Sequence, residues 1–181
     1  MAEGEILQLL YTGNLELTEA QYFEVITRKT AILMSAACQI GAILGDAAEV
    51  QEEALTRMGL NLGITFQLVD DILDFVGTEK ELGKQVGADL KEGRVTLPLI
   101  HALAQAGPAD RERLQEIARN LTTDLVPELR RLFDKYGSLE HARSIARGYT
   151  LKAQDNLAAF PPSREKEYFL AITGELLNRT S

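Results

Sequence analysis

The stretch DAAEVQEEALTRMGLNLGITFQLVDDILDFVG, residues 46–77, gives the longest helical signal in the sequence. Apolar side chains recur in it at helical spacing, at Leu55, Leu62, Phe66, Val69 and Leu73. Asp46 is a residue type that caps helix starts, and Gly77 ends the pattern. About thirty residues of helix extend roughly 45 Å, longer than the usual helix of a globular protein. The stretch therefore predicts a large helical bundle.

The remaining sequence supports an all-α fold, because helical spacing dominates and strand-like alternation is nearly absent. Thr18 and Gln21 have the spacing of a capping box. Four glycines interrupt residues 77–93, which predicts a long ordered loop. Small residues in the two long helices either permit close helix approach or leave space for a ligand, and the sequence does not choose between these. We expect helices at about 3–10, 19–45, 47–76, 96–106, 109–119, 124–136, 138–159 and 163–178.

Composition bounds the function. The 181 residues are 45% hydrophobic and suit one compact domain or a large part of one. A net charge of -8 with no basic block argues against a nucleic-acid partner. The longest uncharged stretch, residues 30–45, is too short to span a membrane. The first residues are acidic where a signal peptide would be basic, so we expect a cytoplasmic protein.

Three aspartates on the long predicted helix carry the most chemistry. Asp70, Asp71 and Asp74 lie three and four positions apart, so their carboxylates share one arc of the helix surface. Like charges at this spacing repel, and the cost rises as water is excluded. Carboxylate oxygens are ligands that Mg²⁺ prefers, often together with substrate phosphates. The triplet alone fits a magnesium and diphosphate site and a solvated acidic stripe about equally.

Several cationic side chains favour the diphosphate site over the solvated acidic stripe. Lys29 lies with Thr30 in an otherwise apolar helix, Lys84 lies in the glycine-rich stretch, and Arg94 follows that stretch. Such cations would pair with a diphosphate opposite the metal. The alternatives are a solvated loop for Lys84 and Arg94, and a side chain that extends out to water for Lys29.

Four motifs resemble the later motifs of all-trans polyprenyl diphosphate synthases, most of all the longer-chain octaprenyl, heptaprenyl and solanesyl types. They are GEILQL at 4–9, KTAILMSAACQIGAILG at 29–45, FQLVDDILDFVG at 66–77 and LGKQVGADLKEGRVTLPLI at 82–100. The resemblance implies the all-α isoprenoid synthase bundle and a tendency to form homodimers. It also implies head-to-tail condensation of an allylic prenyl diphosphate with isopentenyl diphosphate, with Mg²⁺ as cofactor.

The resemblance makes Asp70, Asp71 and Asp74 the second aspartate-rich motif of the family. It implies that Asp70 binds Mg²⁺ directly, and that Asp89 acts through the water shell of the metal.

The same resemblance implies that Lys29 and Lys84 contact the diphosphate of the allylic substrate. Thr30 and Gln67 would face the developing allylic cation. Arg94 stands where the family more often has lysine, which keeps the charge but changes the geometry of its donors. The implied catalytic residues are therefore Lys29, Thr30, Gln67 and Asp70.

The first aspartate-rich motif of the family and its isopentenyl diphosphate pocket lie upstream of any residue in this sequence. We therefore expect residues 1–181 to be the C-terminal part of a single synthase domain, inactive by itself. Two alternatives stay open, a class I terpene cyclase fragment and a non-catalytic helical partner subunit, although DDILD followed by GKQVGAD favours a synthase. The family's main determinants of product chain length lie near the absent motif, so no length is predicted.

Overall fold

The computed structural model describes residues 1–77 and 86–178. Within these ranges the chain is helical and contains no strand, which confirms the all-α prediction. In chain order the elements are α1 Ala2–Leu10, α2 Glu19–Ile26, the π-helical turn η1 Thr27–Ala31, α3 Ile32–Leu44, α4 Glu49–Val76, α6 Ala88–Lys91, α7 Leu97–Gln105, α8 Pro108–Arg119, η2 Thr123–Leu125, α9 Val126–Lys135, α10 Ser138–Asn156, η3 Leu157–Ala159 and α11 Arg164–Asn178.

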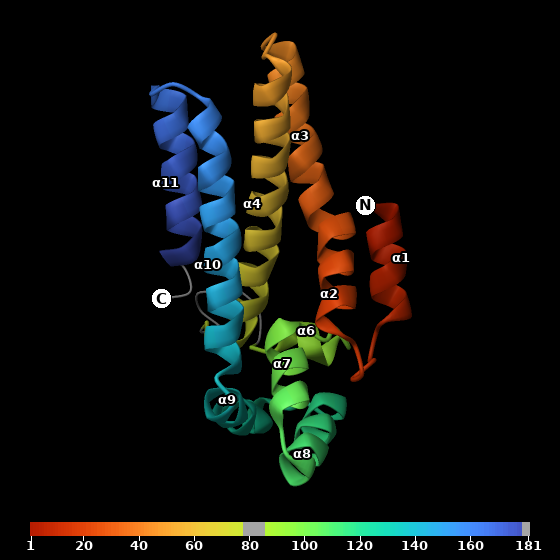
Figure 1. Ribbon diagram of the computed structural model, residues 1–181. Coiled ribbons are helices and arrows are strands. Elements are labelled where there is room, and N and C mark those ends of the chain that lie inside the picture. Colours follow the sequence, from red (N-terminus) through yellow and green to blue (C-terminus); the bar gives the residue numbers. More distant parts are fainter. Residues whose placement is uncertain (78–85, 179–181) are drawn as a thin grey trace.

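The long helices form an elongated bundle around α4. Helices α3 and α10 pack along α4, and α11 lies against α10 (Figure 1). Helices α1 and α2 flank one side, and the shorter α6 to α9 gather beyond the C-terminal end of α4. The core at this end includes the rings of Phe75 and Phe133, which meet edge to face with centroids 5.0 Å apart. The same end of α4 carries the three aspartates.

The predicted helix 19–45 forms with one difference inside it. Thr18 makes the expected capping box, since its side chain accepts the Gln21 N–H and Gln21 accepts the Thr18 N–H. The chain then passes through the π-helical turn η1 before α3 begins. Such turns are rare, and they occur frequently at functional sites. This one carries Lys29 and Thr30.

The start of α4 corrects one prediction. Asp46 does not cap the helix, because its φ of 49° places it in a left-handed turn, whereas an N-cap residue is typically extended. Ala48 is extended and occupies the cap position, and its N–H donates to Gln51 Oε1 at 3.2 Å. The chain uses Asp46 to reverse direction between α3 and α4.

The glycine-rich stretch 77–93 is also not entirely a loop, because the short helix α6 lies within it. Gly87 precedes this helix with φ 73°, a conformation that glycine adopts without strain. Four residues are too few for a helical period to be visible in the sequence. Lys84, a predicted diphosphate contact, lies outside the described residues.

Two glycines of α4 permit close approach of neighbouring helices, one of the two roles that the sequence left open for small residues. A Cβ on Gly63 would lie 2.5 Å from Ala31 Cα, and one on Gly59 would lie 2.7 Å from the Met34 carbonyl oxygen. Both distances are too short for real contacts. Glycine at these positions therefore serves close approach of α4 to η1 and α3. Gly41, on α3, has nothing within 4 Å of its Cβ position.

Gly63→Ala should destabilise the fold because the added methyl group forces α4 away from η1. We expect a loss of about 1–3 kcal/mol in the free energy of unfolding. Gly41→Ala is the matched control, which should stabilise the protein by up to about 1 kcal/mol through helix propensity. Urea unfolding of both variants measures the difference, and equal stabilities would contradict the close-approach reading.

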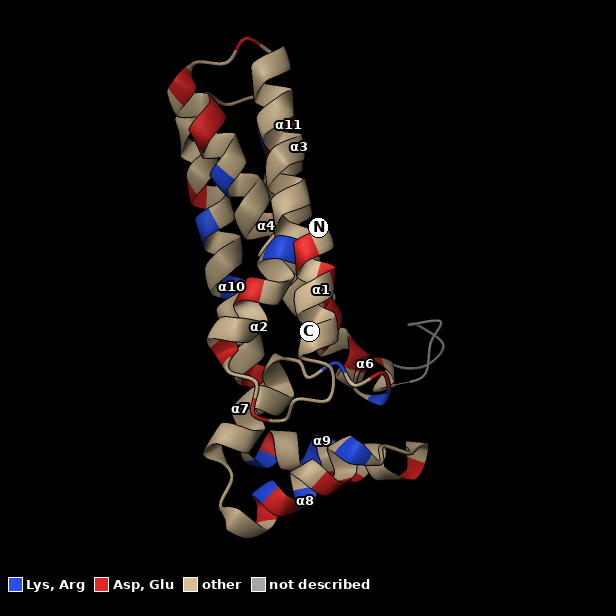
Figure 2. Ribbon diagram, turned by 90° about the vertical axis from the view of Figure 1, so that its right-hand side faces the viewer, with Lys and Arg blue, Asp and Glu red and all other residues tan. Residues whose placement is uncertain are grey.

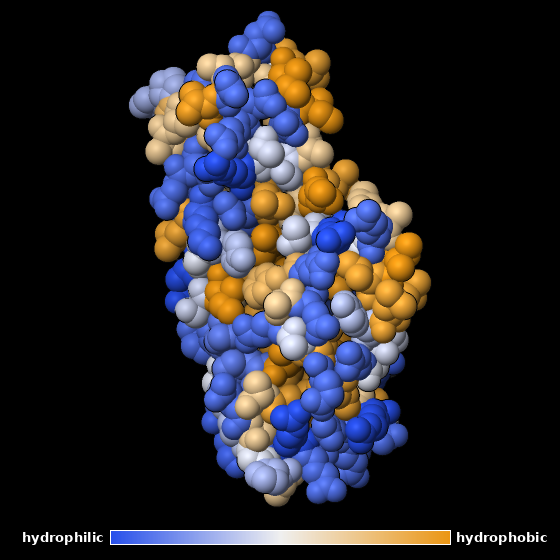
Figure 3. Space-filling view, turned by 45° about the vertical axis from the view of Figure 1, so that its right-hand side comes forward, coloured by the Kyte–Doolittle hydropathy of each residue, from blue (hydrophilic) through white to orange (hydrophobic). Residues whose placement is uncertain are grey.

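Apolar side chains remain exposed along α1 and α3. Figure 2 draws α3 without a charged residue, and Figure 3 shows apolar groups at the upper end and on the right-hand side of the face it presents. The exposed side chains include Ile6, Leu9, Leu10, Ile32, Leu33, Ile40, Ile43 and Leu44. Within the described ranges, none of the helices combines the length and the apolar composition needed to cross a membrane. Patches of this kind typically mark surfaces that pack against other protein.

The two histidines lie together, although they are far apart in the sequence. The rings of His101 on α7 and His141 on α10 stack with centroids 4.0 Å apart. His101 Nδ1 lies 3.0 Å from Ser138 Oγ, and His141 Nε2 lies 3.1 Å from Glu19 Oε1. Burial lowers the pKa of His101 below its ordinary 6.5, and electrostatic repulsion from His141 lowers it further. The negative charge of Glu19 acts in the opposite direction. The pair joins α7, α10 and the start of α2.

The lowered pKa of His101 predicts that stability falls in mild acid. The unfolded chain takes up the proton near pH 6.5, whereas the folded chain resists it. The stabilisation from neutral His101 should therefore be complete above pH 6.5 and be lost as pH falls below it. Urea unfolding at several pH values between about 5 and 8 should show a shallower pH dependence for His101→Gln than for the parent protein. Identical slopes would contradict the prediction.

Candidate functional site

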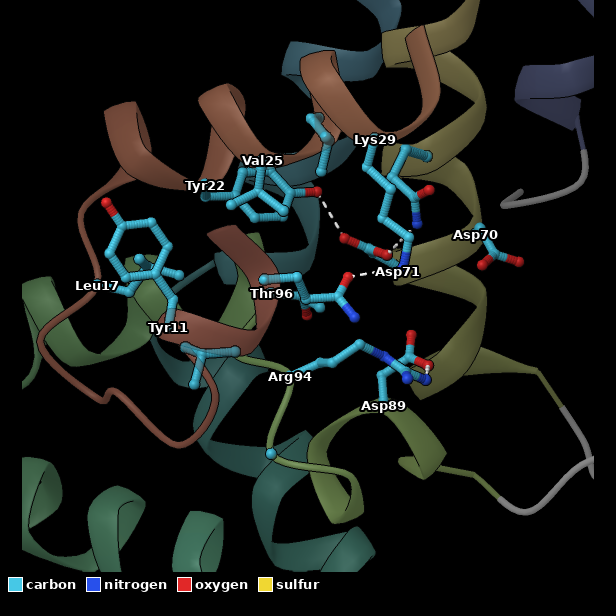
Figure 4. Close-up of a pocket in the computed structure, with 15 residues that line it drawn as sticks. Tyr11, Leu17, Tyr22, Val25, Lys29, Asp70, Asp71, Asp89, Arg94 and Thr96 are labelled. Atoms are coloured by element: carbon cyan, nitrogen blue, oxygen red, sulfur yellow. Dashed lines mark hydrogen bonds and ion pairs between the residues drawn. The ribbon is translucent and has the colours of Figure 1, made fainter. Parts of the chain in front are cut away.

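A pocket of about 260 Å³ lies where α1, α2, η1, α4, α6 and residues 93–96 meet. Its polar lining includes most of the predicted site residues, namely Lys29, Gln67, Asp70, Asp71, Asp89 and Arg94 (Figure 4). Gln8 from α1 joins them. Thr30 and Asp74 are not part of this lining. Residues from both sides of the glycine-rich stretch therefore meet in one cavity.

Three carboxylates converge in the pocket. One oxygen atom each from Asp70, Asp71 and Asp89 lies within 4.8 Å of the other two. Asp70 is exposed, whereas Asp71 and Asp89 are buried. The separation allows a single cation to contact or approach all three, and the donors are the hard oxygen atoms that Mg²⁺ prefers. The residues therefore fit a divalent metal ion.

Asp71 is held by a donor on each of its carboxylate oxygens. The Tyr22 hydroxyl donates to Oδ2 at 2.6 Å, and Gln67 Nε2 donates to Oδ1 at 2.9 Å. Burial raises the pKa of Asp71 to about 7, although these two hydrogen bonds act against the rise. The negative charges of Asp70 and Asp89 add to it. A cation bound here would relieve this electrostatic cost.

Tyr22 is a donor at neutral pH. Burial, followed by the charge of Asp71, raises the pKa of the Tyr22 hydroxyl well above its ordinary value of 10. The phenol therefore keeps its proton and donates a hydrogen bond to the carboxylate. Sequence reasoning missed Tyr22, because a tyrosine in an amphipathic helix reads as a core residue. The available signal was its spacing of seven residues from Lys29, which puts both on one helix face.

Asp74 differs from the other two members of the triplet. Its side chain is fully buried, and Oδ2 accepts the backbone N–H of Asp89 at 3.1 Å. Its carbonyl oxygen accepts the Gly87 N–H at 2.8 Å. Asp74 thus fixes the first turn of α6, which presents Asp89 to the pocket. It does not belong to the group of three converging carboxylates, and its role as a metal ligand stays a prediction.

Lys29 reaches the pocket from η1. Its ammonium group donates to Gln8 Oε1 at 2.8 Å and lies 3.6 Å from Glu5 Oε1. This contact requires α1 to lie close, and Gly4 permits it, because a Cβ there would be 2.3 Å from the Lys29 backbone nitrogen. Gly4 and Gln8 both belong to the GEILQL motif. The motif therefore docks α1 and places an amide beside the lysine.

Gln67 connects Asp71 to the π-helical turn. Its Oε1 accepts the Thr30 hydroxyl at 3.0 Å, while its Nε2 donates to Asp71. A chain of hydrogen bonds thus runs from Tyr22 through Asp71 and Gln67 to Thr30. Three separate elements, α2, α4 and η1, contribute to it. Thr30 lies behind the pocket lining and supports Gln67.

Arg94 lies on the opposite wall and pairs with Asp89 at 2.5 Å and also with Glu92. Burial would lower the pKa of the guanidinium, but the hydrogen bond and charge of Asp89 outweigh this and raise it. The side chain is 30% exposed, so the group remains accessible from the pocket. With Lys29 it gives the pocket two cations beside three carboxylates. This combination can hold an anion such as a diphosphate together with a metal ion.

The family model for polyprenyl synthetase matches residues 1–134 of the sequence. The chain belongs to the polyprenyl synthetase family. This family consists of prenyltransferases with an all-α fold, so the expectations for family and fold are confirmed. The family uses a divalent metal ion, and the acidic cluster of this chain could bind one.

Individual relatives agree with the family assignment. A short-chain isoprenyl diphosphate synthase of Methanothermobacter thermautotrophicus is 37% identical over 99% of this chain and 55% of its own length. An octaprenyl diphosphate synthase of Haemophilus influenzae is 38% identical over 95% of this chain and 53% of its own. A Caulobacter crescentus polyprenyl synthase, crystallised with calcium and isoprenyl diphosphate, has a TM-score of 0.92 at 38% identity and covers 99% of this chain and 56% of that one. The chain spans about half the length of these relatives.

Proposed function

We propose that the protein to which this polyprenyl synthetase chain belongs condenses an allylic prenyl diphosphate with isopentenyl diphosphate and so extends an all-trans prenyl chain. The observation that carries the proposal is the convergence of Asp70, Asp71 and Asp89 in one pocket with Lys29 and Arg94. Acids for a metal and cations for a diphosphate meet there. Asp70, Asp71 and Asp89 would hold Mg²⁺, and the calcium in the Caulobacter relative supports a divalent ion.

Bound Mg²⁺ would neutralise negative charge on the departing diphosphate. Lys29 and Arg94 face the same space and would bind the diphosphate oxygens, with Lys84 as a third contact. The Lys29 ammonium has three donors, so its hydrogen bond to Gln8 leaves two for the substrate. Arg94 can present its planar donors to two oxygens at once.

Gln67 and Thr30 would stabilise the allylic cation. Gln67 Oε1 accepts one hydrogen bond and keeps a second lone pair, and its dipole is fixed by Asp71 and Thr30. A fixed oxygen dipole stabilises positive charge as it develops, without reorganisation. The double bond of isopentenyl diphosphate then attacks the cation. This attack forms the new carbon–carbon bond and leaves a cation on the isopentenyl part. Loss of a proton to the released diphosphate would then convert that cation into the new double bond.

Two further parts of the proposal concern the whole protein. The exposed apolar residues of α1 and α3 are consistent with packing against further chain and with a homodimer. Cytoplasmic residence stays a prediction from the sequence. We also propose that residues 1–181 form the C-terminal part of one synthase domain.

Calorimetry tests the site directly. A complete synthase that carries this sequence should bind inorganic diphosphate in the presence of Mg²⁺, and much less in EDTA. Asp70→Asn should weaken the metal-dependent binding at least about tenfold. Asp155→Asn, which changes an exposed aspartate on α10, is the matched control and should bind like the parent. Metal-independent binding, or equal binding by Asp70→Asn, would overturn the assignment.

A further inference from the structure

We infer that Tyr22 is a positioning residue for the metal and substrate site, acting through Asp71 and, beyond it, through Gln67. The inference deepens the proposed function and rests on it. Tyr22 lies 49 positions before Asp71 in the sequence, on a different helix, yet its hydroxyl donates to that carboxylate at 2.6 Å, closer than the 2.9 Å of Gln67. Figure 4 shows Tyr22 and Asp71 pointing toward one another across the pocket wall.

The Tyr22 ring is fixed from several sides. It is 3% exposed and meets the ring of Phe23 edge to face with centroids 5.4 Å apart. Its helix starts at the Thr18 capping box, which restrains the first turn. A tyrosine side chain has few rotatable bonds, so packing of the ring also fixes its hydroxyl. The donor is therefore held in place before any ligand binds.

The hydroxyl has a specific purpose in this setting. A phenylalanine would supply the same apolar ring, whereas a buried hydroxyl costs free energy unless it is hydrogen-bonded. Its partner here is a carboxylate, and hydrogen bonds to ionised groups are the stronger ones. Buried Asp71 equally needs donors, because its charge is separated from water. The hydroxyl and the carboxylate therefore satisfy one another. The cost of burying both polar groups falls at the wall of the pocket.

The two donors to Asp71 fix the orientation of its carboxylate. Tyr22 holds Oδ2, Gln67 holds Oδ1, and each oxygen keeps further acceptor capacity. Tyr22 thereby restricts rotation of the Asp71 carboxyl group. This restriction sets how the Asp71 oxygens are placed relative to those of Asp70 and Asp89. Partners of this kind around a metal site typically change metal affinity or activity by about 10–100-fold when removed.

The effect of Tyr22 extends to Gln67. An ionised Asp71 carboxylate accepts hydrogen bonds and cannot donate them, so the amide turns its Nε2 toward Asp71 and its Oε1 toward Thr30. A displaced Asp71 would release this restraint on the amide. Tyr22 therefore contributes to both parts of the site, the acidic group and the oxygen dipole. Neither effect requires that Tyr22 touch the substrate.

Tyr22→Phe tests the inference in the complete synthase. Calorimetric titration with Mn²⁺ in the presence of inorganic diphosphate should show about 10–100-fold weaker metal binding. Tyr149→Phe is the matched control, because Tyr149 packs on the same Phe23 ring, at 5.8 Å, and does not line the pocket. It should bind the metal like the parent. Unchanged metal affinity in Tyr22→Phe would overturn the inference.

A double-mutant cycle shows whether Tyr22 acts through Asp71. In an Asp71→Asn background the Tyr22→Phe change should have little further effect on Mn²⁺ affinity. Full additivity would mean that Tyr22 acts by another route and would overturn the inference. Asp70→Asn separates the two levels of the proposal. If Asp70→Asn binds metal normally, the proposed function fails. If it loses binding while Tyr22→Phe does not, only the role of Tyr22 fails.

A second measurement keeps the test decisive if Tyr22→Phe does not fold. Replacing Tyr22 by 3-fluorotyrosine keeps the ring and the hydroxyl and adds a ¹⁹F label beside the hydrogen bond. Its ¹⁹F resonance should shift when Mg²⁺ and inorganic diphosphate are added together, and the shift should be absent with Asp70→Asn. If the protein binds the metal and the ¹⁹F resonance does not shift, the inference is overturned.

Discussion

Asp70→Ala should lower the turnover of a complete synthase carrying this sequence by roughly a thousandfold, because it removes the exposed member of the metal-binding group. Folding should be unaffected or slightly improved. Asp70 lies in contact with water, so little burial is lost, and its removal relieves repulsion with Asp71 and Asp89. A large loss of activity with unchanged stability is the expected signature of a functional carboxylate.

Steady-state kinetics at saturating Mg²⁺, together with urea unfolding, measure the two effects. Asp155→Ala serves as the control, since it removes an exposed aspartate of α10 that no described contact ties to the pocket. Its turnover should match that of the parent protein. Near-normal turnover in Asp70→Ala would remove the carboxylate cluster from the mechanism.

The 181-residue chain by itself should show no prenyl transfer. Ionising an allylic diphosphate requires charge stabilisation that is organised on both sides of the leaving group, and the described residues of the pocket provide one acidic wall. The uncovered apolar side chains of α1 and α3 should also make the isolated chain self-associate. Light scattering across a dilution series should reveal species larger than the monomer.

Adding the upstream half of the synthase as a separate polypeptide should restore transfer and reduce self-association. Activity in the mixture but in neither piece would support the placement of this chain as one part of a synthase domain. Efficient elongation by the 181-residue chain alone would refute it. A mixture that stays inactive although the pieces bind one another would favour the alternative of a non-catalytic partner subunit.

Most of the fold was predictable because it depends on local patterns. The apolar spacing of α4, the capping box at Thr18 and the proline-marked starts of later helices are readable from neighbouring residues. The exceptions depend on tertiary contacts. The π-helical turn η1 is adjacent to Gly63 of another helix, and the short α6 is held by Asp74. Neither feature has a period that a sequence window can detect.

The site was predictable as a set of residue types and less so as a set of roles. The spacing of the triplet placed Asp70, Asp71 and Asp74 on one arc of the helix surface. Their different directions within that arc decide which side chain is exposed and which is buried. Helix α6 covers Asp74, and Tyr22 covers Asp71, so the three acids have three different environments. These covering residues lie on other elements, which is why periodicity along α4 alone missed them.

Product analysis of a complete synthase carrying this sequence tests the central claim most directly. The enzyme would be incubated with an allylic prenyl diphosphate, isotopically labelled isopentenyl diphosphate and Mg²⁺, with a parallel sample in EDTA. We expect labelled all-trans prenyl diphosphates lengthened by whole isoprene units, formed only when the metal is present. Cyclic products, simple hydrolysis of the allylic diphosphate, or elongation that persists in EDTA would contradict a metal-dependent polyprenyl diphosphate synthase.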